Sequence, residues 1–114
     1  QGFDPNSTES YIIFELSQSA HLQNSLEMAS LAQEALVDHA GRADKGIRQA
    51  GFWVLWATGM PSVLVELDFI CNPDAEKFLN TASGRQKCAE ALFEAFGKYF
   101  GRHSEIRRHS NQKY

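Results

Sequence analysis

Two carboxylates stand inside the most apolar stretch of the chain and have the residue type needed for acid–base chemistry. Glu66 and Asp68 interrupt the run 63–70, which otherwise consists of Val, Leu, Phe and Ile. Runs that are apolar on both faces are typical of strands covered by helices on both sides. Because a buried, unpaired carboxylate is costly, we expect Glu66 to be paired, protonated, linked to a metal or at the mouth of a site.

The residues alone leave several roles open for Glu66. It could be a buried structural carboxylate paired with Arg48 or Lys45, since buried acids also form structural networks. It could instead form an acid–base couple with Asp68, because residues two apart on a strand lie ~7 Å apart, a spacing that a glycosidase tolerates. An aspartate at a strand end more often faces solvent, which argues against the couple.

The elements that would position these carboxylates are two short strands. The runs 52–56 and 63–70 are rich in β-branched and aromatic residues and flank a Thr-Gly-Met-Pro-Ser breaker. The connection is too short for a parallel crossover, so the strands should be antiparallel neighbours or not neighbours at all. Two strands make a poor sheet. The pattern therefore predicts an α/β domain, seen here as the C-terminal part of a mostly parallel sheet wrapped by helices, with the N-terminal strands absent from this chain.

Helical patterns surround the two runs. A capping box of Asn6 and Glu9 should open the first helix, and another of Ser83 and Gln86 should open the last. The expected helices cover residues 7–16, 21–40, 73–79 and 84–100, with a kink or break near 17–20 and stops at Gly41 and Gly101. We divide the chain into a domain portion, 1–102, and a flexible basic tail, 103–114.

Composition narrows the function classes. The 114 residues allow one small domain, and a net charge of −3 gives no sign of a nucleic-acid partner. No apolar segment approaches the ~20 residues of a membrane span, and no signal peptide is recognised. Cys71 and Cys88 are expected as buried free thiols rather than a disulfide. The four histidines lack the spacing of a metal site.

The segments around Glu66 carry a family resemblance. Lys-Gly-Ile-Arg-Gln-Ala-Gly-Phe at 45–52 and Met-Pro-Ser-Val-Leu-Val-Glu-Leu at 60–67 are followed by Phe69-Ile70 and Asn72-Pro73. These segments resemble the C-terminal part of the zinc-dependent N-acetylmuramoyl-L-alanine amidases. The upstream stretch 10–16 and the helix after it are similar to Bacteroidetes-type versions. The resemblance covers roughly residues 3–100.

The resemblance implies a peptidoglycan hydrolase of the periplasm or cell envelope that cleaves the amide between N-acetylmuramic acid and the L-alanine of the stem peptide in peptidoglycan or muropeptides. It also implies a zinc ion held by two histidines and a glutamate, with the glutamate at position 66 acting as general base on the zinc-bound water. Arg42 and Lys45 are weaker candidates for contacts with muropeptide carboxylates.

The sequence departs from the family pattern in three ways. The zinc ligands of the family precede residue 1, so this chain alone is expected to hold no catalytic zinc and to be inactive. Asp68 stands where the family usually has glycine, and Cys71 replaces the usual serine.

Other functions stay open beside the amidase. A non-catalytic interaction module could complete its sheet with another chain, either the missing N-terminal half or a homodimer partner. Trp53 and Trp56 could stack on sugar rings, although strand tryptophans usually pack in a core or at an edge.

Overall fold

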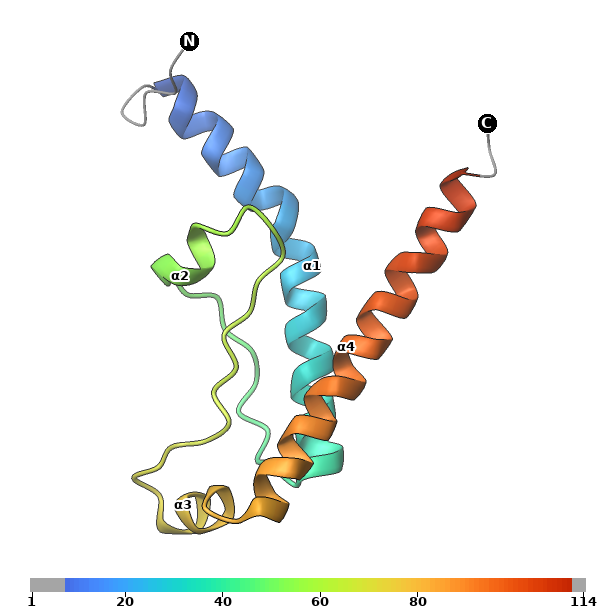
Figure 1. Cartoon of the computed structure of the whole chain (residues 1–114). Helices are drawn as coiled ribbons and strands as arrows, with labels where there is room; N and C mark the ends of the chain where they lie inside the picture. The colour runs from blue at the N-terminus through green and yellow to red at the C-terminus, as the bar shows by residue number, and fades with distance from the viewer. Residues whose placement is uncertain (1–7, 112–114) are drawn as a thin grey trace.

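The computed structural model describes residues 8–111. Within them the chain folds into helices and a long irregular layer, residues 41–70, which contains one helical turn (Figure 1). The helices are α1 (Thr8–Ala40), α2 (Trp53–Trp56), α3 (Pro73–Leu79) and α4 (Ala82–Asn111). The long helices α1 and α4 cross near the C-terminal end of α1 and splay apart toward the chain termini. No strand occurs within the described residues, so the prediction of an α/β fold with a mostly parallel sheet is wrong.

Small side chains build the contact between α1 and α4. Ala91 and Ala95 of α4 are fully shielded from solvent, and they share one cluster with Ala32, Ala35 and other α1 residues. No large side chain is fully buried anywhere in the described chain. Alanines let two helix backbones approach closely, so the crossing gains dispersion contacts over a short interface.

Glycine and a backbone hydrogen bond end α1 as the sequence predicts. Gly41 has φ +62°, a left-handed conformation that residues with a Cβ rarely adopt. Beyond it, the N–H of Arg42 donates to the carbonyl of Leu36 at 3.0 Å. Of the kink or break expected near residues 17–20, the break is wrong, because α1 is continuous through them. Asn6, half of the expected capping box, lies outside the described residues.

Helix α3 matches its prediction at both ends. The Asn72 side chain accepts hydrogen bonds from the N–H groups of Asp74 and Ala75, and Pro73 takes the first helical position.

The turn from α3 into α4 is tighter than the sequence suggested. A Cβ on Gly84 would lie 2.1 Å from the carbonyl oxygen of Phe78, so this position needs glycine. The cap of α4 is Thr81, whose Oγ1 accepts from the N–H of Gly84 at 2.9 Å, and not the predicted Ser83. At the other end, α4 runs past Gly101 to Asn111, so the stop predicted at Gly101 is wrong.

Neither of the two predicted strands is present among the described residues. Residues 53–56 form the single helical turn α2, closed by a hydrogen bond from the N–H of Ala57 to the carbonyl of Trp53. Residues 63–67 are irregular and have no backbone hydrogen bond to any other described residue. A strand exists only when a second extended segment bonds to it, and the described chain supplies none.

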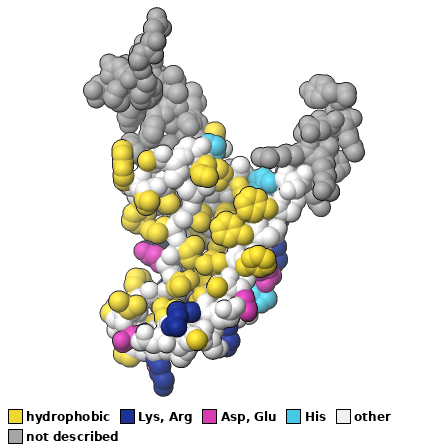
Figure 2. Space-filling view, in the orientation of Figure 1, with side chains coloured by type: hydrophobic (Ala, Val, Ile, Leu, Met, Phe, Trp, Pro, Cys, Tyr) yellow, Lys and Arg dark blue, Asp and Glu magenta, His cyan; other side chains and the backbone are white. Residues whose placement is uncertain are grey.

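Large apolar side chains reach the surface of this irregular layer and of α4 (Figure 2). Those that are at least half exposed include Trp53, Val54, Met60, Phe69, Ile70, Phe93 and Phe100. Of the described helices, none combines the length and the apolar character that crossing a membrane requires.

Candidate functional site around Glu66

Glu66 lies in the extended part of the irregular layer, between the turn after α2 and the start of α3. Val63, Val65 and Leu67 pack against the α1–α4 cluster, while Leu64 and Glu66 are exposed. This alternation over residues 63–67 is the period-two pattern of an extended chain. Glu66 therefore points away from the core, and the expectation that it is a buried acid is wrong.

A polar turn fixes where this extended segment begins. The Oγ1 of Thr58 donates to the carbonyl of Leu55 at 2.9 Å, and the Oγ of Ser62 donates to the same oxygen at 3.1 Å. The N–H of Ser62 then donates to the Oγ of Ser25 on α1 at 2.9 Å. One end of the segment is thus attached directly to the long helix.

Asp68 holds the other end of the segment. Lys45 Nζ donates to Asp68 Oδ1 at 2.7 Å, and Arg42 Nη1 approaches Oδ2 at 3.3 Å. Only 12% of the Asp68 side chain is exposed. Two hydrogen bonds lower the pKa of Asp68 below its ordinary value: the one from Lys45 has the larger effect, and the one from the N–H of Phe69 has the next largest. The carboxylate is therefore ionised at neutral pH and fully engaged.

The two cations of this cluster also contact aromatic rings. The guanidinium of Arg42 lies 3.5 Å from the centre of the Phe78 ring on α3, and Lys45 Nζ lies 4.5 Å from that of Phe69. The Arg42 side chain is 16% exposed, whereas half of the Lys45 side chain faces solvent. Of the two candidate substrate contacts, Lys45 is the more accessible.

These contacts distinguish between the two alternatives for Glu66, a structural ion pair and an acid–base couple with Asp68. Neither Arg48 nor Lys45 pairs with Glu66 in the described chain, and Lys45 pairs with Asp68 instead. An acid–base couple of Glu66 and Asp68 is disfavoured, because both oxygens of Asp68 bind cations. The structure thus places one exposed carboxylate, that of Glu66, near a second one, that of Asp68, whose negative charge is balanced by Arg42 and Lys45.

The described residues do not fit a zinc ion. No group of three or more His, Cys, Asp or Glu side chains among them is arranged to hold a metal. His39 pairs with Glu94, and His103 lies 3.1 Å from a carboxylate oxygen of Glu27. A zinc site would therefore need ligands other than the described residues.

Both cysteines are free thiols. Cys88 is buried in the α1–α4 cluster, where burial raises its pKa, but Cys71 is exposed. The expectation of two buried thiols is therefore correct for Cys88 and wrong for Cys71.

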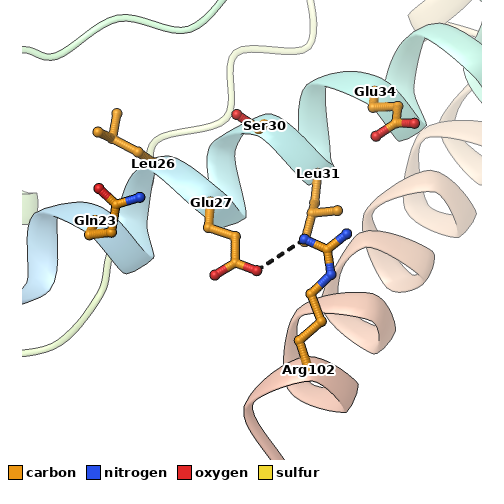
Figure 3. Close-up of a pocket in the computed structure, with 7 residues that line it drawn as sticks. All are labelled: Gln23, Leu26, Glu27, Ser30, Leu31, Glu34 and Arg102. Carbon is orange, nitrogen blue, oxygen red and sulfur yellow. Dashed lines mark hydrogen bonds and ion pairs between the residues drawn. The ribbon is translucent and has the colours of Figure 1, made fainter. Parts of the chain in front are cut away.

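A shallow hollow of about 330 Å³ lies between α1 and α4 (Figure 3), and Glu66 is not among its lining residues. Across it, Arg102 Nη1 contacts Glu27 Oε1 at 3.1 Å, and this contact is the main reason why the pKa of Glu27 is lowered. Its lining residues are Gln23, Leu26, Glu27, Ser30, Leu31, Glu34 and Arg102. Sequence reasoning missed this ion pair, because nothing in the local pattern connects residues so far apart.

Comparison with known proteins identifies the family. The profile of the N-acetylmuramoyl-L-alanine amidases matches residues 4–98. The N-acetylmuramoyl-L-alanine amidase AmiA of Escherichia coli is 35% identical over 102 residues, which are 90% of this chain and 35% of that protein. AmiC of Neisseria meningitidis is 36% identical over 76% of this chain and 21% of its own length.

LytC of Bacillus subtilis is 33% identical over 84% of this chain and 18% of its own length. This chain spans about a third or less of the length of these relatives, and no solved structure gave a significant match. The match to the family profile over most of its length places this chain in the N-acetylmuramoyl-L-alanine amidase family.

Proposed function

We propose that this chain is a portion of a peptidoglycan amidase catalytic domain and that Glu66 is the general base of the reaction. The substrate is the amide between N-acetylmuramic acid and the L-alanine of the stem peptide, in the cell envelope. The observation that carries the proposal is the exposed Glu66 carboxylate, which lies opposite the packed face of its segment and has no ion-pair partner among the described residues. A general base must be free to reach solvent and substrate.

In this proposal Glu66 accepts a proton as water attacks the carbonyl carbon of the amide. The C–N bond then breaks, and the same carboxyl group returns the proton to the leaving amine of L-alanine. Zinc is implied by the family resemblance and would polarise the carbonyl when bound, but no described group of residues fits it.

A hybrid enzyme tests this role. Residues 4–98 replace the matching stretch of E. coli AmiA, and hydrolysis of purified muropeptides is measured with zinc supplied. Glu66→Gln should lower kcat by about 10²- to 10⁴-fold, the usual effect of removing a general base. Glu90→Gln, a change at an exposed glutamate of α4, is the matched control and should leave kcat unchanged. Full activity of the Glu66→Gln hybrid would contradict the assignment.

A second function has its own supporting observation. The backbone N–H and C=O groups of residues 63–67 bond to no other described residue. Extended segments with such unpaired backbone groups can form hydrogen bonds with a strand of another chain. The chain could therefore serve as a non-catalytic interaction module that pairs this segment with another chain, including a second copy. Sedimentation of the 114-residue chain over a range of concentrations distinguishes the two readings: a stable dimer with an inactive hybrid would favour the module.

A further inference from the structure

The extended segment that carries Glu66 is attached to the rest of the molecule by polar contacts at two points. At its start, the N–H of Ser62 bonds to Ser25 of α1. At its end, Asp68 binds Arg42 and Lys45 from residues 41–49, the connector after α1. Between these points no backbone hydrogen bond to another described residue is made. Among the described residues, apolar packing and the two attachments therefore set the direction in which Glu66 points.

The attachment at Asp68 joins several elements. Arg42 donates from Nε to the carbonyl of Ala40 at 3.3 Å, so it is fixed to the last turn of α1. Its guanidinium also lies over Phe78 of α3. Asp68 accepts the N–H of Phe69 at 2.8 Å, which fixes the backbone next to its own side chain. The cluster of Arg42, Lys45 and Asp68, which we call the Asp68 clamp, thus ties the segment to α1, the connector and α3.

We propose that Asp68 is a positioning residue for Glu66. The Asp68 clamp holds the segment in the orientation that keeps the Glu66 carboxylate exposed to solvent. A single residue, Leu67, separates the two carboxylates along the chain, so a change of backbone direction at Asp68 is passed to Glu66. A carboxylate with two cations is a strong, directional restraint when it is shielded from water. This inference rests on the proposed function of Glu66 and adds a role for a second carboxylate.

The clamp is tested first without any enzymatic assay. In the ¹⁵N-labelled 114-residue chain, heteronuclear NOE values report the rigidity of the Val65, Glu66 and Leu67 amides. Asp68→Asn keeps the size of the side chain but removes its charge, and it should lower these values. Asp68→Glu should restore them at least in part. Asp38→Asn, at an exposed aspartate of α1, is the matched control and should not change them.

If Asp68→Asn prevents folding, as judged by loss of helical circular dichroism, Lys45→Met provides the second variant. It removes the 2.7 Å bond but leaves Arg42 and Asp68 in place, so a smaller fall in the same NOE values is expected. Unchanged values in the folded variants would overturn the clamp, whatever Glu66 does.

The hybrid enzyme then separates positioning from simple stability. If Asp68 positions the base, Asp68→Asn should lower kcat by about 10- to 100-fold and leave KM unchanged, because misplacing a catalytic group affects the chemical step. Asp68→Glu should recover part of the loss. An unchanged kcat in a hybrid that Glu66→Gln inactivates would overturn the proposal.

Two further outcomes are informative. A lower KM with unchanged kcat would overturn the positioning role and indicate that Asp68 competes with a substrate carboxylate for Arg42 and Lys45. If Glu66→Gln leaves the hybrid active, the proposed function fails, and a fall of the NOE values would then show a clamp without a catalytic purpose, which also overturns this inference.

Discussion

The α1–α4 crossing and the irregular layer 41–70 differ in how well they bury apolar side chains and in how they satisfy their backbone hydrogen-bonding groups. At the crossing, Ala91 and Ala95 are fully buried and the backbone groups bond within each helix. In the layer, Trp53 is 72% and Ile70 is 75% exposed, and the backbone of 63–67 bonds to no described residue. The radius of gyration of 17.9 Å, against about 13 Å for a compact domain of this length, reflects the open arrangement.

The difference shows what each kind of element needs. A helix satisfies its own backbone and requires a partner only for its apolar face. An extended segment requires a neighbour for its backbone as well, so its local sequence cannot complete it. The layer is held instead by side-chain contacts, among them the Asp68 clamp and the packing of Val63, Val65 and Leu67. We expect changes at the crossing to have the largest effects on stability and changes at the clamp the smallest.

The largest effect is expected from Ala95→Leu in the crossing. The added carbons have no space between α1 and α4, so the free energy of unfolding should fall by about 1–3 kcal/mol. Urea denaturation followed by circular dichroism measures the change. Ala89→Leu, at an exposed site of the same helix, should change stability by no more than about 0.5 kcal/mol. Equal effects would mean that the crossing is not the packed core.

A matched pair of leucines tests whether the layer has an inner and an outer face. Leu67 packs against the α1–α4 cluster, while Leu64 is 47% exposed. Because Leu67 is only partly buried, Leu67→Ala should cost about 1–2 kcal/mol, below the range for full burial. Leu64→Ala should cost less than about 0.5 kcal/mol. The same urea experiment applies, and a reversed order would show that the segment is turned the other way.

The smallest effect concerns the pH dependence of the clamp. The pKa of Asp68 is lowered in the folded chain, so its ionised form stabilises folding. That contribution is complete above the ordinary pKa of an aspartate and is lost as pH falls through the lowered value. The stability difference between the native chain and Asp68→Asn should therefore be greatest near neutral pH and shrink as the pH falls below the ordinary pKa of an aspartate. A difference that grows on acidification would contradict the assignment.

Local signals were read well from the sequence. Asn72 and Pro73 define the start of α3 through short-range hydrogen bonding and a fixed φ, and both ends of that helix agree with prediction. Gly41 ends α1 for an equally local reason, its positive φ. The motif around Glu66 led to the correct family without any structure. Such features depend on neighbours within a few residues, so the sequence contains them in full.

Long-range features were read poorly. The same β-branched residues that indicate strands are found here in a helical turn and in an unpaired extended segment. The sequence singled out Glu66 as the buried acid, but Asp68 is the more shielded of the two carboxylates, because Arg42 and Lys45 approach it from the connector. Which of two carboxylates meets a cation depends on how distant segments fold back, and spacing along the chain does not encode it.

The sequence by itself determined the helix ends at Gly41 and Asn72, the family, and Glu66 as the candidate base. Only the tertiary structure decided that Glu66 faces solvent, that Asp68 is clamped, and that the β-like runs form no sheet among the described residues. The physical reason is that caps and turns are made by neighbouring residues, whereas burial, ion pairing and strand formation each need a partner brought from elsewhere in the fold.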